Sequence, residues 1–96
     1  MIIENPSDYT LQGFRKSKTK GKKYDAILSN KKTKKLKHIP FGDSKYEQYK
    51  DTTGLFLYSH KNHNDENRRD LYRKRHDADG KNKYSSGWFA LNYLWS

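Results

Sequence analysis

The sequence predicts a small α+β domain, in which a basic β-hairpin or three-stranded antiparallel sheet is followed by two or three short helices. Two observations support this fold class. The first half of the chain contains short apolar runs separated by turn residues, as expected of antiparallel strands. The second half contains two segments that carry the start and stop signals of helices. The length of 96 residues is enough for one domain with a thin core.

The first elements are weakly patterned. Residues 1–13 are expected to form an irregular lead-in, and the domain is expected to cover residues 14–96. A short strand is predicted from Gly13 to Lys18. The dipeptide Lys20-Gly21 after it is a turn signal.

The predicted hairpin follows this turn. Residues 24–29 and 36–41 are rich in apolar side chains and are predicted to be strands, and the polar stretch 30–34 between them is predicted to be the turn. Proline lacks a backbone donor, so Pro40 indicates a bulge or a strand end.

Two helices are predicted from their caps and charges. Ser44 and Glu47 have the spacing of a capping box, which predicts a short helix over residues 45–50. Residues 64–76 begin with acids and end with bases, and this order complements the helix dipole. The second segment is the clearer helix.

The apolar run 87–95 is predicted to be a third helix, capped by one of the two serines before it. Trp88, Leu91 and Trp95 have helical spacing and would seal the core. A buried strand is the competing interpretation of this run.

The composition alone lies near that of disordered chains. Leu, Ile, Val and Phe make up only 16 of the 96 residues, and the formal net charge is +10. However, 14 side chains are aromatic, and each covers roughly 150–250 Å² when buried. Most aromatics lie outside the basic segment, so we expect them to build a core rather than to stack on bases.

Other compositional facts exclude whole classes of protein. The chain has no cysteine, which excludes disulfides, a thiolate nucleophile and zinc sites built on cysteine. It has no apolar run near the roughly 20 residues of a membrane span, and its first residues are too short for a signal-peptide core. We expect an intracellular soluble protein or an internal component of an assembly.

The excess positive charge is confined to one segment. Residues 15–37 contain 11 Lys or Arg side chains and one acid, Asp25, so they carry the whole +10. Nearly all of these cations are lysines, which neutralise phosphates as point charges rather than read bases. The predicted phosphate contacts are Lys16, Lys18, Lys20, Lys22, Lys23, Lys31, Lys32, Lys34, Lys35 and Lys37, extended by Arg68 and Arg75 on one face of the predicted helix. A solvated basic face, an anionic membrane surface and an acidic protein partner are the alternatives.

Catalysis is not indicated. His60, His63 and His76 are candidate metal ligands by residue type, but the polar loop around them favours surface or capping roles. The stretch 60–64 is superficially similar to His-Asn-His nucleases, yet the hairpin lies well upstream of it. No nucleophile elbow or phosphate-binding loop is present. We therefore expect no catalytic residue, no metal and no cofactor.

Several motifs carry a resemblance. They are Lys-Lys-Tyr-Asp-Ala-Ile-Leu at 22–28, Pro-Phe-Gly-Asp-Ser-Lys-Tyr-Glu-Gln-Tyr-Lys-Asp at 40–51, Tyr-Ser-His at 58–60, His-Asn-Asp at 63–65, Arg-Arg-x-x-Tyr-x-x-Arg-His at 68–76, and Lys-Tyr-Ser-Ser-Gly-Trp-Phe at 83–89 through Leu-Trp at 94–95. Over about residues 14–95 the chain resembles a family of small uncharacterised basic proteins encoded by large nucleocytoplasmic DNA viruses of algae and amoebae. The resemblance implies a viral setting: synthesis in an infected host cell, in the cytoplasm, a viral factory or the nucleus, and packaging in the virion. It implies no activity.

Together these observations predict a non-enzymatic viral nucleic-acid-binding protein. It would bind DNA in preference to RNA, mainly without sequence preference, through a lysine-rich hairpin, in genome condensation or packaging. The alternative is a minor virion or capsid-associated structural protein that docks on acidic protein surfaces. A small nuclease is a third hypothesis.

Overall fold

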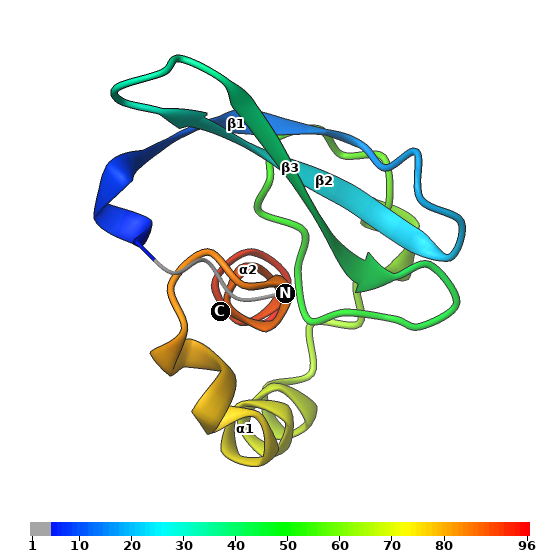
Figure 1. The fold of residues 1–96 in the computed structure, drawn as a ribbon. Coiled ribbons are helices and arrows are strands. Elements are labelled where there is room, and N and C mark those ends of the chain that lie inside the picture. Colours follow the sequence, from blue (N-terminus) through cyan, green and yellow to red (C-terminus); the bar gives the residue numbers. More distant parts are fainter. Residues whose placement is uncertain (1–4) are drawn as a thin grey trace.

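The computed structural model describes residues 5–96, and the first four residues lie outside that description. Three antiparallel strands form one sheet in the order β1-β2-β3 (Figure 1). Their bounds are Tyr9–Lys16 for β1, Lys22–Asn30 for β2 and Leu36–Asp43 for β3. The sheet is followed by two α-helices, so the predicted α+β class is confirmed.

Both helices lie on the same side of the sheet (Figure 1). Helix α1 spans Glu66–Arg75, and the Asp65 side chain caps it by accepting from two backbone amides of the first turn. Helix α2 spans Ser86–Tyr93, and the Ser85 hydroxyl accepts from the amide of Trp88 at 3.1 Å. The two later predicted helices are therefore confirmed. Ser85 is one of the two serines expected to cap α2, whereas Asp65, expected inside α1, caps it instead. A short 3₁₀ helix at Pro6–Asp8 precedes β1. Two more, at Ser59–Lys61 and Asp77–Lys81, lie before and after α1.

The core lies between the sheet and α2. Its buried side chains are Tyr24, Ala26, Leu28, Ile39, Phe41, Tyr84, Phe89 and Leu94. Phe89 stacks on Phe41 with ring centroids 5.4 Å apart and on Tyr84 with centroids 5.8 Å apart. Aromatic rings therefore supply much of the apolar area that the few aliphatic residues cannot.

The predicted apolar stripe of α2 is only partly correct. Leu91 is buried, but Trp88 and Trp95 are only partly buried and lie at the edge of the core. Phe89 and Leu94 fill the centre instead. Helix α2 packs against β3 on one side and against the 3₁₀ helix 77–81 on another, so it is buried over more than one stripe.

The predicted helix over residues 45–50 is wrong. Gln48 instead forms a parallel bridge with Asn62, and the backbone of Ser44 donates to the carbonyl of Gly21. The Gln48 side chain is buried, and its amide donates to the Tyr58 carbonyl and to Asn62. Hydrogen bonds to distant segments thus outweigh the weak local preference for a helix.

The strand boundaries also differ from the prediction. Strand β1 begins at Tyr9, inside the expected lead-in, and ends at Lys16. The register shift lies in β1 between Leu11 and Gly13, and β3 continues through Pro40 without one. Strand β3 is an edge strand, and there a proline loses no ladder hydrogen bond.

Candidate nucleic-acid interface

The basic segment is one stretch in sequence but two surfaces in space. Its lysines gather at the two turns of the sheet, which lie at opposite ends of β2 (Figure 1). The first lysine tip comprises Lys16, Lys18, Lys20 and Lys22, and the second lysine tip comprises Lys31, Lys32, Lys34, Lys35 and Lys37. Strand β2 has nine residues, so the tips are about 26 Å apart at roughly 3.3 Å per residue.

All nine lysines of the tips are exposed. In the described part of the chain, no ion pair joins any of them to an acid. The nearest acid in sequence, Asp25, is bound elsewhere: its carboxylate accepts from Arg15 at 3.1 Å and from the Ser17 hydroxyl at 2.6 Å. Asp25 therefore neutralises Arg15. Asp43 lies across from Lys22 in the sheet but forms no ion pair with it.

The second lysine tip is held in one conformation by Asn30. The Asn30 side chain accepts from the amides of Lys32 and Thr33, and its carbonyl accepts from Lys34 at 2.8 Å. Lys34 has a φ of 63°, in the left-handed region that favours glycine or asparagine. The turn therefore presents its lysines on an ordered backbone.

Lys23 does not belong to either tip, and its predicted role as a phosphate contact is wrong. It is only 1% exposed. Its ammonium group donates to the Tyr46 carbonyl at 2.6 Å and to the side-chain oxygen of Gln48. Burial, aided by the positive charge of Lys61, lowers the pKa of Lys23 to about 8. Lys23 thus ties β2 to residues 46–48 rather than facing solvent.

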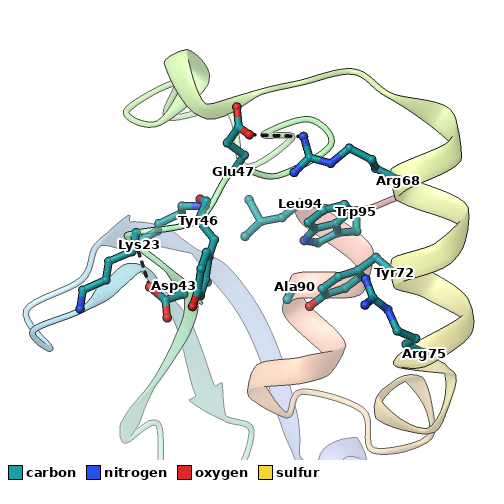
Figure 2. A pocket seen from close by; sticks show the side chains of 12 residues that line it. Lys23, Asp43, Tyr46, Glu47, Arg68, Tyr72, Arg75, Ala90, Leu94 and Trp95 are labelled. Carbon is teal, nitrogen blue, oxygen red and sulfur yellow. Dashed lines mark hydrogen bonds and ion pairs between the residues drawn. The ribbon is translucent and has the colours of Figure 1, made fainter.

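Arg68 and Arg75 line a pocket of about 380 Å³ between α1 and residues 43–47 (Figure 2). Arg68 pairs with Glu47 at 3.3 Å, whereas Arg75 has no ion-pair partner within residues 5–96. The two arginines predicted to extend the basic footprint are thus brought together at one pocket and not at the lysine tips. The sequence did not reveal the pocket's other residues, because three separate segments assemble it.

The other arginines of α1 have structural roles. Arg73 donates to the carbonyls of Leu91 and Trp95 at 3.1 and 3.2 Å, which joins α1 to the C-terminal helix. Arg69 lies over the ring of Tyr49, 4.9 Å from its centroid. These contacts fix the orientation of the helix face that carries Arg68 and Arg75.

The histidines support helix ends and aromatic stacks. Nδ1 of His63 accepts from the amide of Asp65 at 2.9 Å, and burial lowers the pKa of His63. His76 lies 3.1 Å from Asp79 and stacks on Tyr72. Nowhere in residues 5–96 do three potential metal ligands cluster.

Comparison with known proteins gives no match: no protein-family model, no curated protein and no solved structure is similar to this chain. The viral family therefore stays a prediction. Among the described helices, none has the length and apolar character needed to cross a bilayer.

Proposed function

We propose that this protein binds nucleic acid through its phosphates, with little sequence preference, by means of the two lysine tips. The observation that carries the proposal is the set of nine exposed lysines without acidic partners at the two ends of one sheet. Lysines without acidic partners neutralise phosphates of a nucleic-acid backbone and release the counterions condensed on it. Condensation or packaging of a genome is the role that such binding serves. DNA is favoured over RNA because the resemblance implies a DNA virus.

The spacing of the tips suits one nucleic-acid molecule. A separation of about 26 Å corresponds to about 8 base pairs at 3.4 Å each, so both tips reach one duplex. The sheet face between them carries Arg15 and His38 and one acid, Asp25, which is 2% exposed and bound by Arg15. No exposed acid of the three strands on this face would repel the phosphates.

The backbone at Lys34 also supports a binding role. A lysine with a φ of 63° costs about 1 kcal/mol relative to a residue that prefers this region. Glycine would avoid that cost, but it would remove one of the free charges. Strain of this kind is typical of positions kept for function rather than for stability.

A salt titration of binding to a 16-base-pair duplex tests the proposal. If about six phosphates are engaged, the slope of log K against log salt is about −5, and affinity falls on the order of 10³-fold between 50 and 200 mM salt. The first-tip variant Lys18/Lys20/Lys22→Gln and the second-tip variant Lys31/Lys32/Lys35→Gln should each reduce the slope by up to about 3.

The matched control is Lys50/Lys74/Lys81→Gln, which removes the same charge at exposed positions outside the tips. We expect the control to bind nearly as the unaltered protein does. Equal losses in the control and the tip variants would mean that only net charge matters. Absence of binding to DNA and RNA at low salt would refute the proposal and favour the alternative, docking on an acidic protein surface.

A further inference from the structure

The pocket beside α1 has three walls from separate parts of the chain (Figure 2). Helix α1 supplies Arg68, Tyr72 and Arg75, and residues 43–47 form the opposite wall. Ala90, Leu94 and Trp95 form the floor. Its volume of about 380 Å³ lies within the roughly 300–1,000 Å³ usual for small-ligand sites.

A three-ring stack makes the α1 wall rigid. Trp95 lies parallel to Tyr72 with centroids 4.1 Å apart, and His76 stacks on Tyr72 at 4.2 Å. Figure 2 shows the Tyr72 hydroxyl and the Trp95 indole nitrogen on the side of the pocket. Both groups donate hydrogen bonds, so the fixed rings present donors rather than ring faces to a ligand.

The charge of the lining favours an anion. Lys45, Arg68 and Arg75 line the pocket together with two acids, Asp43 and Glu47. Lys23 also borders it, but its ammonium group is buried and bound by Tyr46 and Gln48. Arg75 lacks an ion-pair partner in the described residues, and the Arg68–Glu47 pair has both side chains about half exposed. Exposed pairs of this kind are weak, so Arg68 can exchange Glu47 for a phosphate, which the guanidinium fork binds well.

Tyr46 gives the pocket a platform for a planar group. Its side chain is 68% exposed, although its backbone is fixed by the hydrogen bond from Lys23. Figure 2 places its ring on the opposite side of the pocket from Tyr72 and Trp95. An exposed aromatic ring beside cationic groups is the arrangement on which nucleic-acid bases stack.

The pocket also adjoins the first lysine tip. Lys22 and Asp43 are paired across β2 and β3, and the amide of Ser44 donates to the Gly21 carbonyl at 2.9 Å. The wall that carries Lys45 and Tyr46 therefore begins where the first lysine tip ends. A nucleic-acid strand bound at this tip would therefore reach the pocket directly.

From these contacts we propose that the pocket binds a nucleotide that carries a terminal phosphate, with the phosphate on Arg75 and Arg68 and the base against Tyr46. The nucleotide is either free or the 5′ end of a nucleic-acid strand. The strand-end form rests on the proposed function, because the first lysine tip would hold the rest of the strand.

Fluorescence of Trp95 tests the pocket directly, with Trp88→Phe as the background so that Trp95 is the single reporter. The probes are thymidine 5′-monophosphate, thymidine and inorganic phosphate. We expect saturable quenching by the monophosphate, and binding of the other two at least about tenfold weaker. Arg75→Ala should weaken the monophosphate about tenfold or more, and Tyr46→Ala about fivefold or more.

Lys74→Ala is the control, because Lys74 is exposed on the same helix but does not line the pocket. It should leave monophosphate binding unchanged. Equal binding of inorganic phosphate and the monophosphate, or equal losses in Lys74→Ala and Arg75→Ala, would overturn the proposed nucleotide site.

Oligonucleotides distinguish the two sources of the nucleotide and the two proposals. A 5′-phosphorylated single strand that binds more tightly than its 5′-hydroxyl form supports strand-end binding, and equal affinity refutes it. The second-tip variant should lose duplex affinity but keep the monophosphate site. Duplex binding without monophosphate binding would refute the pocket alone, and the reverse result would refute the proposed function alone.

Discussion

Lys23→Met should change how the stability of the protein depends on pH. Lys23 is buried, and burial lowers the pKa of its ammonium group from the ordinary value of 10.5 to about 8. The unfolded chain keeps this proton to a higher pH than the folded protein does. The free energy of unfolding therefore rises as the pH increases from 8 toward 10.5.

The size of this rise follows from the pKa change. Each pKa unit corresponds to 1.36 kcal/mol, so keeping the buried charge below pH 8 costs up to about 3 kcal/mol. Between about pH 7.5 and 9.5, linkage recovers at most about 2 kcal/mol of that cost. We therefore expect a gain of about 1–2 kcal/mol over this range of pH.

Thermal or urea unfolding at the two pH values measures the effect. A gain of about 1–2 kcal/mol raises the melting temperature of a domain of this size by roughly 5–15 °C. Tyr24, whose pKa is raised to about 12 by burial and its bond to Asp51, loses its proton only above this range. Lys23→Met should lose the rise, and its neighbour Lys22→Met, at an exposed position, should keep it.

Two results would refute this reasoning. One is a pH dependence in Lys23→Met equal to that of the unaltered protein. The other is a Lys23 pKa near 10.5, measured by titration of its side-chain carbon signals in NMR. Either result would mean that the ammonium group is solvated and that Lys23 is available to phosphates after all.

Three further predictions concern single positions. Gly42→Ala should destabilise the fold by about 2–4 kcal/mol in urea unfolding, because φ at Gly42 is 76° and the new Cβ would lie 2.8 Å from Leu94. The control is Gly21→Ala, where φ is 85° but the space around a new Cβ is open; it should cost only about 1 kcal/mol. Similar losses at both glycines would contradict the close contact. Lys34→Gly should raise the melting temperature by a few degrees and reduce the slope of log K for DNA binding against log salt by about 0.9. A gain in stability without a smaller slope would show that Lys34 makes no phosphate contact. The free energy of unfolding should fall as the pH drops below about 6.5, because the pKa of His63 is lowered in the folded protein and the unfolded chain takes up the proton first. His63→Gln should reduce this fall. An unchanged pH profile in that variant would exclude His63 as its source.

The sequence predicted the elements whose signals are local. Ser85, one of the two serines expected to cap the last helix, caps α2, because a cap needs only the amides of the next turn. The charge order of residues 64–76 likewise predicted α1, although Asp65, expected inside the helix, caps it. The three strands were likewise marked by the turns between them. The false helix at 45–50 had a similar signal, but Gln48 within it bonds to Asn62, which no local pattern connects to it.

The candidate site was predictable in its residue types but not in its arrangement. Ten lysines of the basic segment were expected on one surface, and nine are exposed. Alternation along β2 places Lys23 on the face opposite Tyr24, so its burial depends on residues 46–48, which are far away in sequence. The pocket was not predictable, because α1, α2 and residues 43–47 meet there only in the folded chain.

The division of the lysines into two tips explains how so basic a chain folds. The two groups are about 26 Å apart, whereas charges are screened within about 8 Å at physiological salt. The lysines of each tip therefore repel mainly one another and hardly those of the other tip. The neutral, aromatic-rich core forms between the tips without the repulsion that all ten excess charges would exert at one place. The sheet that separates the tips also fixes the distance between the two groups of proposed phosphate contacts. The same spacing that limits self-repulsion thus sets the length of polyanion that can engage both tips at once.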